Sequence, residues 1–163
     1  MLHLVIGEIN AGKTWYLQNH YQSHHSGDGV IALKVMEGPE IIGFNAHFLA
    51  SGITQTFMKH ELKYMDEFEQ IGRIGPYIFD QAVFNNILEY LHALIENNVT
   101  PIYIDEIGRY ELNGHGYHDI IKTIVRHKLE AYFTCHQNLA NEIIDYFNLE
   151  PVDIINVKGT NHV

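Results

Sequence analysis

The octapeptide Gly7–Thr14 is the feature of this sequence that most restricts its fold. It reads G-E-I-N-A-G-K-T and satisfies the pattern G-x-x-x-x-G-K-[ST] without a substitution. An apolar segment, Leu2–Ile6, precedes it, and a helical pattern over Lys13–Gln22 follows. In this context the glycines allow a tight turn whose backbone N–H groups converge on an anion, and the N-terminal end of the helix adds positive potential. The sequence therefore predicts a strand, loop and helix that bind nucleotide phosphates.

Particular roles follow for the side chains of this loop. Lys13 is expected to reach the β- and γ-phosphates, and the Thr14 hydroxyl to bind Mg²⁺. Glu8 brings a negative charge, so its side chain is expected to point away from the phosphates. Trp15 is interpreted as packing in the core under the loop, with stacking on a base as the alternative. The predicted nucleotide-binding residues are Gly7, Glu8, Ile9, Asn10, Ala11, Gly12, Lys13, Thr14 and Trp15.

A second apolar segment, Pro101–Ile104, ends in the acidic pair Asp105 and Glu106. Asp105 is placed to hold Mg²⁺ directly or through its water shell. Glu106 is placed to orient or deprotonate an attacking water. Alone, such a pair would indicate only a solvated strand end, but the phosphate loop upstream favours catalysis. The pair also suits a hydrolase better than a kinase, which must keep water out.

Three further side chains are candidates for contact with the γ-phosphate or with the transition state. His136 follows the apolar run Ala131–Cys135, where it could sense the γ-phosphate or hold the water, although a polar loop before a helix is an equal reading. With Lys13 and Glu106, it completes the predicted catalytic set. Arg73 and Arg109 could approach the transition-state charge, but surface salt bridges are the preferred interpretation for both.

The remaining pattern predicts an α/β fold with a mostly parallel sheet flanked by helices. Short connections between three strand-like runs predict an antiparallel hairpin extension. An irregular loop is expected over Met65–Pro76, and an amphipathic helix over Phe79–Asn97. The other predicted strands are Val30–Val35, Ile41–Phe48, Ile53–Lys59, Ile102–Ile104 and Val152–Val157, and the other predicted helices are Tyr117–Lys128 and Asn138–Phe147. Residues 1–163 are expected to form a single domain.

The net charge, the apolar runs and the single cysteine limit which partners and which cellular location are expected. The formal net charge of −10 argues against nucleic acid, because phosphate backbones require a basic surface. No apolar run approaches the length of about 20 residues that a membrane-spanning helix needs. Cys135, the only cysteine, is expected to be buried and cannot form an intramolecular disulfide. We expect a cytoplasmic protein; no particular protein partner is predicted.

The stretch Asp105–Leu112, which reads D-E-I-G-R-Y-E-L, resembles the D-E-I-G-K-M-E-L segment of the small THEP1-like nucleoside-triphosphatases. The resemblance extends over nearly the whole chain and implies a RecA-like P-loop domain with slow, Mg²⁺-dependent hydrolysis of several nucleoside triphosphates. By position it gives the phosphate and metal roles to Lys13 and Thr14, the metal role to Asp105 and the catalytic role to Glu106. Glu111 matches a later acid of the family, which could close a helix N-terminus or hold Arg109.

Two other functions remain open from the sequence. A nucleoside or nucleotide kinase would need an acceptor pocket, which the segment 30–59 could form, and usually a lid with arginines. The chain has only three arginines. A nucleotide-gated binding module would use slow hydrolysis to time a partner interaction. Hydrolysis of nucleoside triphosphates is the preferred hypothesis.

Overall fold

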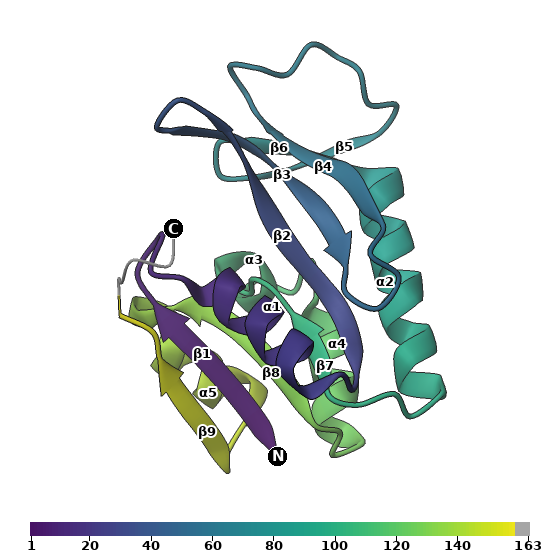
Figure 1. The fold of residues 1–163 in the computed structure, drawn as a ribbon, viewed down its shortest axis with the longest axis vertical. Helices are drawn as coiled ribbons and strands as arrows, with labels where there is room; N and C mark the ends of the chain where they lie inside the picture. The colour runs from purple at the N-terminus through teal and green to yellow at the C-terminus, as the bar shows by residue number, and fades with distance from the viewer. Residues whose placement is uncertain (159–163) are drawn as a thin grey trace.

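A computed structural model describes residues 1–158, and Figure 1 shows them as one twisted sheet with helices on both faces. The strands are β1 (Leu2–Gly7), β2 (Asp28–Glu37), β3 (Glu40–Phe48), β4 (Thr54–His60), β5 (Ile71–Ile74), β6 (Tyr77–Asp80), β7 (Ile102–Ile104), β8 (Ala131–His136) and β9 (Val152–Asn156). The helices are α1 (Lys13–His24), α2 (Gln81–Glu96), α3 (Arg109–Leu112), α4 (His118–Arg126) and α5 (Ala140–Phe147), with a 3₁₀ turn, η1 (Gln137–Leu139), before α5. Over the described residues the nine strands lie in the order β5-β6-β4-β3-β2-β7-β8-β1-β9.

One half of the sheet is parallel. β1 pairs with β8 and β9, and β7 pairs with β2 and β8, all in parallel. Parallel neighbours require crossover connections, and α1, α4 and α5 lie in the connections that lead to β2, β8 and β9. The carboxyl ends of β1, β7 and β8 therefore meet at one edge, where the phosphate loop and the acidic pair follow their strands.

The other half is antiparallel, so the expectation of a mostly parallel sheet is not confirmed. Among the described residues four strand pairings are parallel and four are antiparallel, the latter being β2–β3, β3–β4, β4–β6 and β5–β6. The expected hairpins of β2, β3 and β4 are present. The hairpin of β5 and β6 occupies part of the segment that the sequence predicts as an irregular loop and the first two residues of the predicted helix, Phe79 and Asp80.

Packing between Gly72 and Phe79 explains that error. The two residues pair across β5 and β6, and a Cβ on Gly72 would lie 2.1 Å from the Phe79 ring. The glycine leaves room for the aromatic ring to cover the strand, whereas in the sequence it reads as a turn signal. Phe79 is therefore a strand residue. Helix α2 begins two residues later, after Asp80 accepts a hydrogen bond from the Ala82 amide as its N-cap.

Two apolar cores hold the helices to the sheet. The larger core unites the inner faces of α2, α4 and α5 with one face of the sheet, and Leu4 of β1 belongs to it. The smaller core lies under α1 on the opposite face, where Leu17 packs among Val5, Tyr103 and Tyr132. Neighbouring residues of β1 thus point to opposite cores, as the two-residue period of a strand requires. Cys135 is buried, as expected.

In the part of the chain that the structure describes, no helix is both long and apolar enough to cross a membrane.

Candidate active site

The phosphate loop has a backbone that its glycines make possible. Gly12 precedes α1 in the left-handed region with φ of 100°, and Asn10 is also left-handed with φ of 64°. A Cβ on Gly7 would lie 2.7 Å from the Val157 carbonyl oxygen, so the last residue of β1 must be small. The loop therefore needs glycine at Gly7 for space and at Gly12 for conformation.

Lys13 lies folded back over this loop. Its Nζ donates hydrogen bonds to the carbonyl oxygens of Gly7, at 3.1 Å, and Glu8, at 2.8 Å, and lies 3.6 Å from Oε2 of Glu106. The side chain is only 6% exposed. The Glu8 carboxylate is exposed and accepts a hydrogen bond from Nε2 of Gln137 at 3.2 Å. The ammonium group thus links the loop to the acidic pair.

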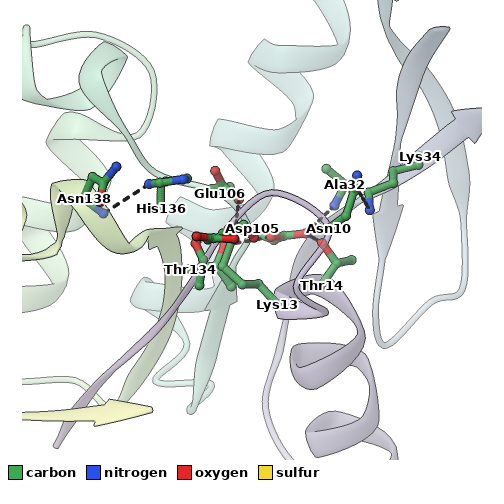
Figure 2. A network of polar contacts seen from close by, with 12 residues as sticks. Asn10, Lys13, Thr14, Ala32, Lys34, Asp105, Glu106, Thr134, His136 and Asn138 are labelled. Atoms are coloured by element: carbon green, nitrogen blue, oxygen red, sulfur yellow. Dashed lines mark hydrogen bonds and ion pairs between the residues drawn. The ribbon is translucent and has the colours of Figure 1, made fainter. Parts of the chain in front are cut away.

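Both carboxylate oxygens of Asp105 accept hydrogen bonds (Figure 2). Its Oδ2 accepts hydrogen bonds from the Thr14 hydroxyl at 2.8 Å and the Ala32 amide at 3.0 Å, and its Oδ1 accepts one from the Thr134 hydroxyl at 2.7 Å. Burial raises the pKa of this carboxyl group, while the three hydrogen bonds and the Lys13 charge oppose the rise. These contacts hold the carboxylate beside Thr14.

Glu106 has a more open position than Asp105. Its side chain is 48% exposed and lies at a cavity wall. Loss of solvent around the group raises its pKa, Lys13 lowers it, and the neighbouring Asp105 raises it. A carboxylate with an open face beside a lysine can accept a proton from a small molecule in the cavity.

The cavity has a volume of about 610 Å³ and joins the phosphate loop to the antiparallel half of the sheet. Lys13, Thr14, Asp105 and Glu106 line one end of it. Aromatic and apolar side chains of β3, β4, β6 and α2 also line it. The structure therefore brings the predicted loop and acidic pair together in one concave site.

Trp15 differs from its preferred interpretation. The residue is 41% exposed and lines the cavity, so it does not pack in the core beneath the loop. Helix geometry explains this, because α1 buries Lys13 and Leu17, four residues apart on one face, and Trp15 lies on another face.

Of the remaining predicted residues, two line the cavity and one lies outside its lining. His136 lies outside the cavity lining, and its Nδ1 accepts a hydrogen bond from the Asn138 amide at 3.1 Å, which caps η1 (Figure 2). Arg73 and Arg109 both line the cavity, but each also has an acidic partner: Glu61 at 2.5 Å and Glu142 at 3.9 Å.

Glu111 connects the two helices that follow the acidic pair. Its carboxylate accepts hydrogen bonds from the amides of Gly108, at 2.8 Å, and Tyr117, at 3.2 Å. This contact closes the N-terminus of α3, one of the two roles considered from the sequence, and no hydrogen bond or ion pair to Arg109 is found within the described residues. Burial raises the pKa of Glu111 to about 7, against the effect of these hydrogen bonds.

Sequence reasoning missed two polar residues of the site. Thr134 holds Asp105 from the middle of an apolar strand, where a hydroxyl among buried side chains was the only signal. Lys34 on β2 donates a hydrogen bond to the side chain of Asn10, as Figure 2 shows, and so ties the loop to the sheet. The sequence gives no signal for this contact, because β2 and the loop become neighbours only in the folded chain.

Comparison with known proteins places this chain in a family. Residues 3–162 match the family described as NTPase. The chain belongs to this NTPase family. Membership confirms the resemblance seen in the sequence and the enzyme class, nucleoside-triphosphatase. No curated protein sequence gives a significant match.

Two solved structures share the fold of this NTPase. THEP1 from the hyperthermophile Aquifex aeolicus superposes with a TM-score of 0.72 at 19% identity, over 99% of this chain and 92% of that one. A human cancer-related nucleoside triphosphatase superposes with a TM-score of 0.59 at 21% identity, over 98% of this chain and 89% of that one. These likenesses confirm a mixed α/β fold of this type.

Proposed function

We propose that the protein hydrolyses nucleoside 5′-triphosphates, ATP and GTP among them, to the diphosphate and inorganic phosphate with Mg²⁺ as cofactor. The observation that carries this proposal is the contact of Thr14 with Asp105, with Lys13 and Glu106 beside them in one cavity. Family membership supports the reaction class. The order β2-β7-β8-β1-β9, with β8 between the strands of the loop and the acidic pair, supports a RecA-like P-loop domain.

The residues present fit Mg²⁺. Carboxylate and hydroxyl oxygens are the ligands that this ion prefers, and Asp105 and Thr14 present both within hydrogen-bonding distance of each other. In the proposed complex these two residues hold the ion directly or through water. The bound ion would neutralise charge on the β- and γ-phosphates.

The chain's own residues supply the remaining chemistry. Backbone amides of residues 8–14 and the N-terminus of α1 bind the phosphates. Lys13 exchanges its bonds to the Gly7 and Glu8 carbonyl oxygens for phosphate oxygens. Glu106 orients the attacking water and accepts its proton. We also propose that His136, the last residue of β8, senses the γ-phosphate.

Phosphate release from a panel of Mg-nucleoside triphosphates tests the proposal. Glu106→Gln should retain nucleotide binding and lose turnover by about 100-fold or more, because only the proton acceptor is removed. Lys13→Ala should lose binding as well, and omission of Mg²⁺ should stop the wild type. Glu89→Gln, a neutralised acid on an exposed part of α2, is the matched control and should remain active. Normal turnover by Glu106→Gln would refute the mechanism.

A further inference from the structure

The cavity is lined by more than the phosphate loop and the acidic pair. Its volume of about 610 Å³ has to hold nucleotide phosphates and the attacking water, and its lining continues from these residues onto aromatic side chains. Six rings form what we call the aromatic wall: Phe44, Phe57, Tyr77, Phe84, Tyr110 and Tyr117. They come from β3, β4, β6, α2, α3 and the residue before α4, so six separate segments converge there.

The position of the aromatic wall relative to the phosphates follows from the strand order. β7, which carries the acidic pair, lies between β1, which carries the phosphate loop, and the antiparallel strands β3, β4 and β6. In phosphoryl transfer the nucleophile approaches in line, from the side opposite the leaving oxygen. With Glu106 as proton acceptor for the nucleophile, the space beyond Glu106 is where a nucleophile larger than water would lie. The aromatic wall lines the same cavity as Glu106.

The ring arrangement suits a flat molecule. Phe44 and Tyr77 meet edge to face at 5.1 Å between centroids, as do Phe57 and Phe84 at 5.5 Å. Phe57 and Phe84 are almost completely buried in the larger core, so their rings contribute packing more than free surface. Phe44 and Tyr77 are half-buried, so part of each ring still faces open space.

The charges at this end of the cavity disfavour an anion. Among the cations that line the cavity, Arg73 is paired with Glu61, Arg109 lies 3.9 Å from Glu142, and Lys34 is bonded to Asn10 of the loop. Glu106 and Glu111 also contribute carboxyl groups to the lining. An occupant with hydroxyl groups and no charge meets the acids without repulsion.

We propose that the aromatic wall binds an uncharged, ring-bearing alcohol of the nucleoside class, which serves as an acceptor for the γ-phosphoryl group. This inference rests on the proposed function of the phosphate loop and adds an activity to it. The acceptor hydroxyl oxygen forms a bond to the γ-phosphorus as the bond from that phosphorus to the β,γ-bridging oxygen breaks, and Glu106 takes the hydroxyl proton. The products are the nucleoside diphosphate and a phosphate monoester of the acceptor.

A product-partition experiment tests this inference. The wild type is incubated with γ-³²P-labelled Mg-ATP and, in turn, adenosine, guanosine, cytidine and uridine, and labelled monophosphate and inorganic phosphate are quantified in the same sample. At least one nucleoside should yield labelled monophosphate. Ile74→Trp, which fills the cavity from β5, should reduce that product by about tenfold or more and leave phosphate release within about twofold. Ile71→Trp, an exposed position on the same strand that does not line the cavity, is the matched control and should retain both products.

A second variant avoids added bulk. Phe44→Leu removes one ring and should raise the KM for the nucleoside by about fivefold or more without changing phosphate release. Inorganic phosphate as the sole product with all four nucleosides would overturn the acceptor inference and leave hydrolysis in place. Equal monophosphate formation by wild type, Ile74→Trp and Phe44→Leu would overturn the assignment to the aromatic wall. Absence of both products from the wild type would show instead that the proposed function had failed.

Discussion

At the residue scale the site depends on polar groups that act through a neighbour. Thr134 is fully buried and does not line the cavity, yet its hydroxyl holds one oxygen of Asp105 while Thr14 and Ala32 hold the other. An acid satisfied on both oxygens has little freedom to rotate. It can therefore present the same lone pairs to a metal ion each time one binds.

Thr134→Val should weaken the proposed metal site while the fold is preserved. Valine has nearly the same shape but leaves Oδ1 of Asp105 without its hydroxyl donor. The Mg²⁺ concentration for half-maximal phosphate release should rise by about tenfold, the lower end of the range for an outer-shell ligand partner. Thr134→Ser restores a hydroxyl and should recover most of the loss. An unchanged Mg²⁺ titration of the valine variant would show that Thr134 only packs.

Glu111 should make stability depend on pH. Its folded-state pKa of about 7 lies above the ordinary value of 4.5, so the native state keeps this proton to a higher pH than the unfolded chain does. Its contribution is fully present below pH 4.5 and is lost as pH rises through about 7, a change of about 3 kcal/mol at most. Urea unfolding from pH 4.5 to 8 should show this fall in wild type and in Glu89→Gln. Glu111→Gln should show a clearly smaller fall, and parallel curves for all three proteins would exclude the effect.

At the element scale, β2 joins the two halves of the sheet. It pairs in parallel with β7 and antiparallel with β3. Asp28 at its first position accepts hydrogen bonds from the amides of Gly29 and Ala50 and from the Tyr90 hydroxyl of α2. The parallel half, the loop after β3 and the long helix are therefore tied together at the start of one strand.

Gly29→Ala should destabilise the folded state, because there is no space for an added Cβ. A Cβ there would lie 2.1 Å from the Tyr103 carbonyl oxygen, so β2 and β7 would have to move apart. We expect a loss of about 3 kcal/mol in the free energy of unfolding. Gly38→Ala, in the β2–β3 turn with φ of +59° and open space around it, should lose only about 1 kcal/mol of conformational strain. Chemical denaturation of both variants checks the contrast, which equal losses would contradict.

At the scale of the whole molecule, the larger core spans both halves of the sheet. It contains Phe57 and Phe79 of the antiparallel half together with Ile102 and Phe133 of the parallel half. Helix α2 contributes Phe84, Ile87 and Leu91 to the same core. The smaller core also contains Leu49, which follows β3, beside Val5 of β1 and Tyr132 of β8, so within the described residues each apolar core has members from both halves.

The described chain should therefore unfold in one cooperative transition. Trp15, the single tryptophan, reports on the start of α1 beside the parallel half, whereas far-ultraviolet circular dichroism reports on all elements. Urea curves from the two signals should coincide at the same midpoint. A tryptophan transition displaced from the dichroism transition would show that the halves unfold separately and would contradict a single domain.

The sequence by itself determined the phosphate loop, the acidic pair and most of the strands and helices. These features are local: glycine at fixed spacing permits one kind of turn, and apolar periodicity over a few residues predicts a strand or helix. Only the tertiary structure decided the β5–β6 hairpin, the support of Asp105 by Thr134, the exposed place of Trp15 and the aromatic wall. Each of these depends on which distant segments become neighbours, as when Phe79 covers Gly72 or six segments meet around one cavity. That choice is made by the order of strands in the sheet, because the strand order sets which side chains share a face and an edge.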